Sequence, residues 1–353
     1  MAFLKIENVC IRGFSGCVPK ATEENCSLPF YTPEEAGHLI EEIGIVRKHI
    51  APAEITVADM CYGAAQKLIE ELGWEKESID LLALCTQNPD YINLPTSFLV
   101  HERLDLPQTT MCLDFFHGCP GWVVSLSSVC GLLSSGSIKR AILLDGDEVT
   151  KWLFANNREE RPLFGDAGTA TALEFDLNAK PMYFNIGTLS DEGKSLINPD
   201  GGFRNPYTME SMKYTLDARA GRLPKEKWHK VMDSMDVFSF AITKIPKAMK
   251  ALCAEFDINI SDVDKLVLHQ ANKFMLENIA RRMKFPMEKV PLGLRYYGNT
   301  TSASIPLALV TECQKEITTG KQKNLVCGFG TGLSWGAAYF ETNEIICPDI
   351  VEI

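Results

Sequence analysis

One cysteine in this chain occupies a position that suits a nucleophile. Cys119 follows the run 109–116 and precedes a run of small and apolar residues at 123–133. The pattern predicts a short strand, a tight turn and a buried helix that begins at the cysteine. N–H groups at a helix N-terminus stabilise a thiolate and lower the pKa of a cysteine, and Pro120 is tolerated in the first helical turn. The alternative is a buried structural cysteine, which is the more common kind.

Three further polar features lie in the rear part of the chain. His269 stands at the carboxyl end of an expected apolar strand, where a structural histidine is the alternative interpretation. Asn299 directly precedes an expected buried helix, which an asparagine there could also cap. The segment 328–332 is glycine-rich, which permits close approach of the backbone to a ligand. Because ligands of α/β sheets bind at the carboxyl ends of strands, we expect these groups and Cys119 to share one cleft.

The chain contains a weak copy of itself. Residues 79–88 resemble residues 263–272, an offset of 184 positions (263 − 79). Two further pairs share that offset: 139–144 with 323–328, and Ala64, Leu68 and Leu72 with Ala248, Leu252 and Phe256. The alternative is a general likeness between α/β segments. The repeat predicts two similar halves, 1–180 and 181–353, with an inserted cap at about 187–235.

Both halves are expected to have the same order of elements. The order is an amphipathic helix (59–73 and 237–255), a strand (79–85 and 263–269), a helix (119–134 and 300–317), a strand (140–145 and 324–329) and a closing strand (168–175 and 334–341). Alternating strands and helices predict an α/β fold with mostly parallel sheets and right-handed crossovers. Cys119 and His269 then belong to different halves and meet in a cleft between them.

Composition and charge restrict the classes of function. The 353 residues carry a net charge of −11, which argues against nonspecific binding to nucleic acid or to an anionic membrane surface. No apolar run reaches the length of a membrane span, and the N-terminus does not resemble a signal peptide. Twelve cysteines without a C-x-x-C pair are typical of a reducing cytoplasm, and the scattered histidines predict no metal site.

Several longer motifs run through nearly the whole chain. They are Gly44-Ile45-Val46-Arg47, Leu163-Phe164-Gly165-Asp166, His269-Gln270-Ala271-Asn272, and the segments 297–306 and 328–336. Together these motifs resemble the β-ketoacyl-acyl carrier protein synthase III family of thiolase-fold condensing enzymes. The resemblance implies a five-layered α-β-α-β-α fold made of two duplicated halves and a homodimer. It also implies a catalytic triad of Cys119, His269 and Asn299, with the N–H groups of Cys119 and Thr331 holding the oxyanion.

The chemistry that this resemblance implies fits the residue types. A thiolate at Cys119 would take an acyl group from an acyl-coenzyme A or acyl-carrier protein thioester. A malonyl thioester, carried by the carrier protein, would then lose CO₂, and His269 and Asn299 would stabilise the enolate by hydrogen bonds. The enolate carbon would attack the acyl-cysteine to give a β-ketoacyl thioester, in fatty-acid or specialised lipid or polyketide biosynthesis. This chemistry requires no metal and no redox cofactor.

The resemblance also assigns contacts to substrate and carrier. The residues expected at the substrate and its pantetheine arm are Asn272, Arg158, Phe329, Gly330 and Leu94. Leu94 stands where the family has an aromatic residue that reaches the partner subunit's acyl pocket. Arg281 and Arg282, with Lys284, are expected to dock an acidic acyl carrier protein, and Lys244, Lys247 and Lys250 form a second basic patch. The alternative for each basic patch is a solvated helix face.

The chain departs from the family pattern where coenzyme A is held. His38 and Glu42 stand at the positions of a tryptophan and an arginine, and Phe274 stands at the position of another arginine. Glu42 would repel a phosphate, and His38 lacks the large ring of a tryptophan. We therefore expect coenzyme A to be bound poorly or differently. His117 replaces a small residue ahead of the nucleophile, and its role stays open.

Two alternative functions remain beside condensation. One is an acyltransferase that passes the acyl group from Cys119 to an alcohol or amine without decarboxylation. The other is a non-catalytic partner subunit of a synthase. Retention of His269 and Asn299 argues against both, because decarboxylation is the step that needs this pair. A thiolase is disfavoured, because Cys327 is expected to be an inward strand residue rather than a second reactive cysteine.

Overall fold

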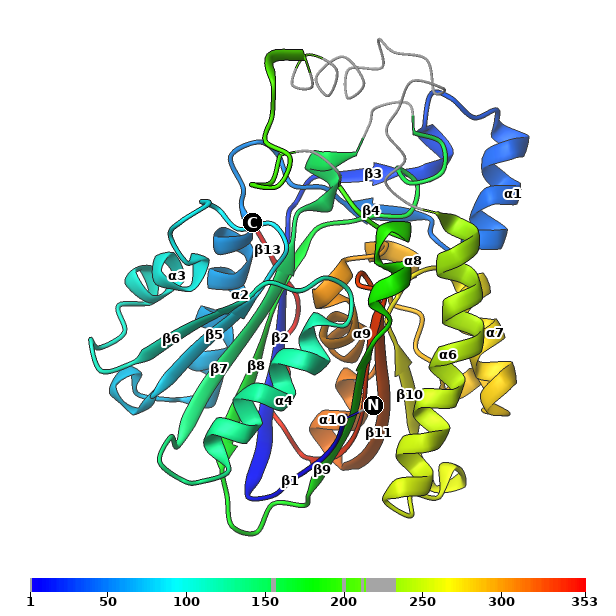
Figure 1. Ribbon diagram of the computed structural model, residues 1–353. Coiled ribbons are helices and arrows are strands. Elements are labelled where there is room, and N and C mark those ends of the chain that lie inside the picture. The colour runs from blue at the N-terminus through cyan, green and yellow to red at the C-terminus, as the bar shows by residue number, and fades with distance from the viewer. Residues whose placement is uncertain (1, 154–156, 199–200, 211–212, 214–232) are drawn as a thin grey trace.

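The first of two large sheets contains most of the front half of the chain. The computed structural model describes residues 2–153, 157–198, 201–210, 213 and 233–353 (Figure 1). This sheet has six strands in the order β13-β2-β8-β7-β5-β6. They are β2 (Val9–Val18), β5 (Leu81–Cys85), β6 (Met111–Phe115), β7 (Arg140–Asp147), β8 (Ala167–Phe175) and β13 (Val351–Glu352). All five residues of β5 are buried, as expected for an apolar strand covered on both faces.

The second sheet repeats the topology of the first. Its five strands have the order β1-β9-β12-β11-β10. They are β1 (Ala2–Ile6), β9 (Met182–Thr188), β10 (Lys265–Leu268), β11 (Lys321–Gly330) and β12 (Ser334–Asn343). In both sheets one parallel pair, β5 with β7 or β10 with β11, is followed by two antiparallel pairs. The first and last strands of the chain each join the sheet of the other half. The N-terminal β1 pairs with β9 of the second sheet, and the C-terminal β13 pairs with β2 of the first sheet.

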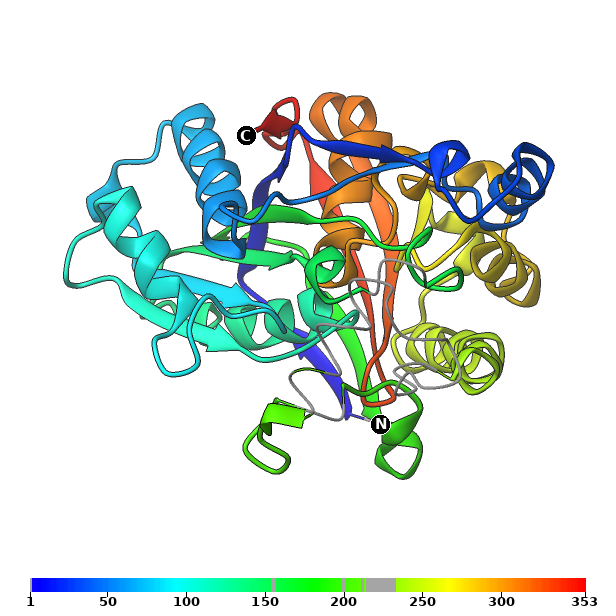
Figure 2. The same ribbon diagram turned by 90° about the horizontal axis from the view of Figure 1, so that it is seen from above.

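Helices fill three layers around and between the sheets, as Figures 1 and 2 show. The central layer holds α4 (Gly121–Leu133) and α9 (Ser304–Glu312). The layer on the first sheet holds α2 (Val57–Leu72) and α3 (Thr96–Leu104). The layer on the second sheet holds α6 (Ser234–Glu255) and α7 (Lys273–Met283). Trp122 of α4 contacts Phe14 of β2 and Phe340 of β12, with ring centroids 6.2 and 6.1 Å away. One buried aromatic side chain thus joins both sheets, and the predicted five-layered fold of two duplicated halves is confirmed.

Smaller elements connect these layers. They are the strands β3 (Thr22–Glu24) and β4 (Arg47–His49), the helices α1 (Pro33–Ile43), α8 (Leu294–Tyr297) and α10 (Gln314–Thr319), and 3₁₀ turns at Asn25–Ser27, Lys76–Ser78, Val149–Trp152, Ser190–Ser195, Ile260–Asp262, Met287–Lys289 and Thr301–Ala303. No helix among the described residues is both long and apolar enough to cross a bilayer. Each of the twelve cysteines has a free thiol.

The predicted elements are present, but the prediction of mostly parallel sheets is wrong, because four strand pairs of the two large sheets are parallel and five are antiparallel. The bounds of most elements differ by a few residues, and the two central helices differ in a way that bears on the site. The helix predicted at 119–134 begins two residues after Cys119, at Gly121. The helix predicted at 300–317 is divided, because Cys313 leaves the helical conformation between α9 and α10. Within the predicted cap at 187–235, residues 199–200, 211–212 and 214–232 lie outside the described residues. Residue 180 lies between β8 and β9, and the division into two domains at that point stays a prediction.

Candidate active site

Cys119 lies in the turn that joins β6 to α4. Pro120 occupies the N-cap position of α4, and the Gly121 N–H donates to the Gly118 carbonyl oxygen over 2.7 Å. The prediction that the helix begins at the cysteine is therefore wrong by two residues, because Pro120 supplies the cap rather than the first helical residue. Cys119 is 7% exposed, so its sulfur is almost entirely enclosed by protein.

The end of strand β11 passes directly against this turn. A Cβ atom at Gly330 would lie 2.8 Å from the Cys119 sulfur, and the φ of Gly330 is +154°. A Cβ atom at Gly328 would lie 2.7 Å from the Cα atom of Pro120. The close approach thus requires a glycine at both positions. At Gly330 the backbone conformation, which L-residues rarely adopt, requires a glycine as well. The backbone of the rear half borders the nucleophile of the front half.

Burial determines the protonation state of Cys119. Enclosure in protein raises the pKa of the thiol to about 12, and the negative charge of Asp147 acts in the same direction. The backbone N–H groups of Thr331 and of Cys119 itself lower this pKa, but burial outweighs them. The predicted lowering of the pKa by a helix N-terminus is therefore wrong. The same two N–H groups are those expected to hold the oxyanion, and both reach the sulfur.

His269 follows β10 and is 2% exposed. The backbone N–H of His269 donates to the Cys327 carbonyl over 2.9 Å. The Nδ1 atom of the ring lies 2.7 Å from the Ser304 hydroxyl. Burial lowers the pKa of the imidazole to about 3, while the Thr301 backbone acts weakly in the opposite direction, so His269 is neutral. The contact with Ser304 occupies Nδ1 of the ring. The Phe329 ring stands edge-on to the imidazole, with centroids 5.3 Å apart.

Asn299 is fixed by backbone and side-chain hydrogen bonds. Its N–H donates to the Leu163 carbonyl over 2.8 Å, and its own carbonyl accepts from the Gly165 N–H over 3.1 Å. The side-chain oxygen accepts from the Thr301 N–H over 2.9 Å. Because Oδ1 is held in this way, the NH₂ group of the carboxamide is left to donate to a reactant. Asn299 is 6% exposed.

A continuous set of contacts connects the three predicted catalytic residues. Gly330 touches Cys119, and the preceding Phe329 packs on His269. His269 contacts Ser304, at the start of α9 and five residues after Asn299. A Cβ atom at Gly121 would lie 3.2 Å from the Cβ atom of Ser302 in the same segment. The structure therefore brings the turn at Cys119, the end of β10 and the segment after Asn299 together at the ends of the two central helices.

Comparisons with known proteins agree with this arrangement. Residues 113–189, which include Cys119, match the family model 3-oxoacyl-[acyl-carrier-protein (ACP)] synthase III, and residues 253–342, which include His269 and Asn299, match the C-terminal model of that synthase. A solved 3-oxoacyl-(acyl-carrier protein) synthase from Burkholderia xenovorans LB400 is 31% identical, with a TM-score of 0.91, and the alignment covers 100% of this chain and 99% of that one. The chain belongs to the β-ketoacyl-acyl carrier protein synthase III family.

Other relatives extend the likeness in sequence and in fold. A β-ketoacyl-[acyl-carrier-protein] synthase III from Fusobacterium nucleatum is 27% identical over 333 residues, which cover 94% of this chain and 98% of the relative. The priming β-ketosynthase of the R1128 polyketide biosynthetic pathway is 21% identical, with a TM-score of 0.78, and the alignment covers 97% of this chain and 98% of that one. The latter likeness concerns the fold alone.

Several residues that the synthase III resemblance assigns to the substrate have other contacts here. Arg158 forms an ion pair with Glu35 of α1 over 3.0 Å and lies over the Tyr31 ring at 4.5 Å. Asn272 caps helix α7, where its Oδ1 atom accepts from the Met275 N–H over 2.8 Å. These contacts are structural, and the predicted roles of Arg158 and Asn272 toward the pantetheine arm stay predictions.

Three further predicted residues lie at the surface. Leu94 is partly exposed in the loop before α3. Arg281 and Arg282 are exposed in the last turn of α7. The Lys250 ammonium of α6 donates to the Arg282 carbonyl over 2.7 Å, so the two predicted basic patches adjoin each other.

Two buried residues at this site were missed by the sequence analysis. Ser304 contacts His269, and Asp147 accepts hydrogen bonds from both halves of the chain. A signal for Asp147 was available, because Leu144-Asp145-Gly146-Asp147 places acidic residues at the carboxyl end of an apolar strand. No comparable signal exists for Ser304, which only the packing of α9 against β10 brings to the imidazole.

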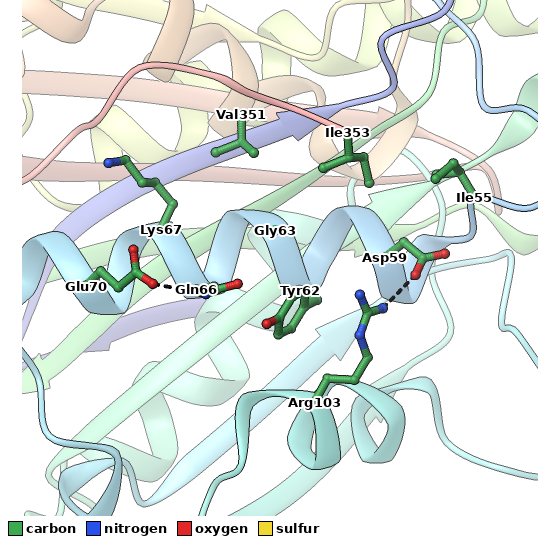
Figure 3. A pocket seen from close by; sticks show the side chains of 10 residues that line it. All are labelled: Ile55, Asp59, Tyr62, Gly63, Gln66, Lys67, Glu70, Arg103, Val351 and Ile353. Atoms are coloured by element: carbon green, nitrogen blue, oxygen red, sulfur yellow. Dashed lines mark hydrogen bonds and ion pairs between the residues drawn. The ribbon is translucent and has the colours of Figure 1, made fainter.

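A surface cavity of about 410 Å³ lies on the outer face of the first sheet, away from these residues. It is lined by α2, by Arg103 of α3 and by the chain end at Val351 and Ile353 (Figure 3). Arg103 forms an ion pair with Asp59 over 2.6 Å and lies over the Tyr62 ring at 4.2 Å. Lys67 pairs with Glu71 over 2.6 Å, and Glu70 accepts a hydrogen bond from Gln66 over 3.0 Å, so each charged group of the lining has a partner and we assign no ligand to the cavity.

The close approach of β11 predicts the effect of a methyl group at Gly330. In Gly330→Ala, the added Cβ would meet the Cys119 sulfur in a strained backbone conformation, so we expect acylation of Cys119 by a thioester to slow on the order of tenfold or more. The measurement is the acylation rate by intact-protein mass spectrometry. Gly320→Ala is the matched control, because that glycine is extended, with no atom within 4 Å of the added Cβ. Equal rates in both variants would contradict the prediction.

The raised pKa of Cys119 predicts how its alkylation depends on pH. Because a thiol with a pKa of about 12 is mostly protonated below that pH, its thiolate fraction rises about tenfold per pH unit. We expect the rate of Cys119 alkylation by iodoacetamide to keep rising from pH 7 to pH 9.5. Peptide mass spectrometry measures it, and the exposed Cys26 monitors the reagent. A rate that levels off below pH 8 would indicate a pre-ionised thiolate instead.

Proposed function

We propose that this protein condenses an acyl thioester with a malonyl thioester, in two steps, to give a β-ketoacyl thioester. In the first step the Cys119 sulfur attacks the acyl carbonyl, the donor's thiolate leaves, and the thiol proton ends on the released thiol. In the second step the malonyl carboxylate leaves as CO₂, and the resulting carbanion forms a carbon–carbon bond to the acyl group. The bond to Cys119 breaks, and the Cys119 thiolate that leaves takes up one proton from water, which regenerates the thiol.

The observation that supports this proposal most strongly is the pairing of two kinds of donor around Cys119. The N–H groups of Cys119 and Thr331 reach the sulfur. They are therefore near the acyl carbon that this sulfur would attack, on which the oxyanion of a tetrahedral intermediate would form. A neutral His269 and the NH₂ group of Asn299 supply the second set. The Ser304 hydroxyl lies 2.7 Å from Nδ1 of His269. In the proposed reaction this hydroxyl donates to Nδ1, so that Nε2 carries the proton and donates to the enolate oxygen. Decarboxylation is the step that needs both members of this second set, because both donate to the enolate oxygen.

The contacts of helix α1 support a carrier protein rather than coenzyme A as the acyl donor. The resemblance places Arg158 at the mouth of the substrate channel, but Glu35 neutralises its charge. His38 and Glu42 are exposed on the same helix. A nucleotide phosphate would meet carboxylates at this helix and little uncompensated positive charge. A pantetheine arm that is attached to a protein brings no nucleotide.

The basic surface of α6 and α7 supports docking of an acyl carrier protein. Arg281, Arg282 and Lys250 are exposed and adjoin each other across the two helices. The chain as a whole is acidic, with a net charge of −11, so an acidic partner would be repelled elsewhere. We propose this patch as the carrier's docking surface. The proposed reaction needs no metal or redox cofactor, because both steps are thioester chemistry.

We propose that two copies of the chain form a homodimer along strand β6. This strand lies at the edge of the six-stranded sheet, so one side of it has unpaired backbone groups. Apolar side chains around it are exposed, among them Phe116 at 80%, Met111 at 45% and Phe98 at 49%. A second copy placed on β6 would cover them and would bring its Leu94 loop close to the first copy.

The experiment that tests the proposed reaction separates acylation from condensation. We expect intact-protein mass spectrometry to show one acyl group on the wild type, and none on Cys119→Ser at neutral pH, after incubation with acyl-carrier protein. Malonyl-carrier protein labelled in the free carboxylate should then release labelled CO₂. His269→Ala and Asn299→Ala should lose CO₂ release by about 10²-fold or more while keeping acylation.

The outcomes distinguish the three functions. Acylation without CO₂ release from any malonyl donor would contradict condensation and favour acyl transfer to an alcohol or amine. No acylation by any acyl-carrier protein or acyl-coenzyme A donor would contradict both and favour the partner subunit.

The dimer is tested on the same preparation. Native mass spectrometry should give twice the chain mass of 39.3 kDa, and Phe116→Asp should shift the equilibrium toward the monomer because it buries a charge in the proposed interface. Phe203→Asp, which changes another exposed phenylalanine, is the control. A wild type that is monomeric at micromolar concentration would contradict the proposal.

A further inference from the structure

The residue two positions after Asn299 has a strained backbone. Thr301 has a φ of +50°, in the left-handed region, where a β-branched side chain is an outlier. Its N–H is the group that donates to the Asn299 side-chain oxygen over 2.9 Å. The orientation of the Asn299 carboxamide therefore depends on Thr301 staying in this conformation. Strain of this kind persists only where surrounding contacts hold it.

Asp147 supplies such contacts. This residue ends strand β7 and is fully buried. One of its oxygens, Oδ2, accepts hydrogen bonds from the Thr301 hydroxyl, from the Ser302 hydroxyl over 2.7 Å and from the Ser302 N–H over 3.3 Å. The carboxylate thus holds both the strained residue and the one after it.

The other oxygen of Asp147 is bound by the front half of the chain. Oδ1 accepts from the Gln87 N–H over 2.9 Å and from the Thr86 hydroxyl over 3.2 Å, both at the end of β5. Burial raises the pKa of Asp147, while the hydrogen bonds of the five donors that converge on its carboxylate act in the opposite direction and favour the ionised form. Asp147 joins the end of β5, the end of β7 and the segment after Asn299.

We propose that Asp147 is a positioning residue that holds Thr301 in its left-handed conformation and thereby directs the Asn299 carboxamide toward the reacting malonyl group. The proposal rests on the proposed condensing function. Asp147 acts through Thr301 and touches no substrate. It makes the decarboxylation step depend on a contact between the two halves of the chain.

The charge of Asp147 has a second, opposite effect on the first step. It raises the pKa of the Cys119 thiol, so it disfavours the thiolate. The other titratable groups that face this region are Asp145 of β7, whose pKa burial raises strongly, and the buried Cys85 of β5. Asp147 hinders ionisation of Cys119, which acts in the acylation step, and yet five donors bind its carboxylate. This is consistent with a role of Asp147 in the decarboxylation step.

The test uses variants that separate charge from hydrogen bonding. In Asp147→Asn we expect CO₂ release from malonyl-carrier protein to fall at least about tenfold, while iodoacetamide alkylation of Cys119 at pH 8 becomes about two- to tenfold faster. Thr301→Val keeps the branched shape but loses the hydroxyl, so CO₂ release should fall while alkylation stays at the wild-type rate. Thr301→Ser keeps the hydroxyl and should recover most of the CO₂ release.

Controls and contradicting outcomes are as follows. Asp264→Asn makes the same change at an exposed position and should alter neither rate. Asp147→Asn with wild-type CO₂ release would overturn the proposal, and so would slower alkylation together with slower CO₂ release. If Asp147→Asn does not fold, Thr301→Val with undiminished CO₂ release overturns it. Absence of CO₂ release from the wild type is a separate result, which contradicts the proposed function itself.

Discussion

The contact between the glycine end of β11 and the turn at Cys119 is the constraint on which this site depends. Gly328 and Gly330 let one backbone lie against the other without a side chain between them. The contact encloses the sulfur, and this burial raises the thiol pKa. It also places the Thr331 N–H at the sulfur, and it sets Phe329 on the imidazole of His269. One close approach thus keeps the Cys119 thiol protonated and places there the N–H group of Thr331, one of the two proposed to hold the oxyanion.

Duplication of one sheet topology explains how the site is divided between the halves. The nucleophile turn follows β6 of the first sheet, and His269 follows β10 of the second. Each half alone supplies an incomplete set of reactive groups, and the central helices α4 and α9 bring the two sets together (Figure 1). Asp147 adds a buried polar contact across this junction. Buried polar networks of this kind specify one arrangement when every member is satisfied.

Much of the fold was predictable from local patterns, because the short length of apolar runs such as β5 favours a buried strand over a buried helix. The motifs around Cys119, His269 and Asn299 singled out three residues that the fold brings to one region, and their catalytic roles stay predictions. The pKa of Cys119 was not, because burial by β11 involves residues about 210 positions away and outweighs the helix N-terminus. The roles of Ser304 and Asp147 likewise arise from packing between distant segments. Local sequence contains the elements but not the contacts between them.

In the proposed reaction one cavity holds an acyl group on Cys119 between two sets of donors. A crystal structure of the acylated protein measures this most directly. We expect the acyl carbonyl oxygen about 2.7–3.1 Å from the backbone nitrogens of Cys119 and Thr331, with Nε2 of His269 and Nδ2 of Asn299 facing the same cavity. An acyl oxygen that points away from both nitrogens, or side chains of His269 and Asn299 that face separate spaces, would contradict it.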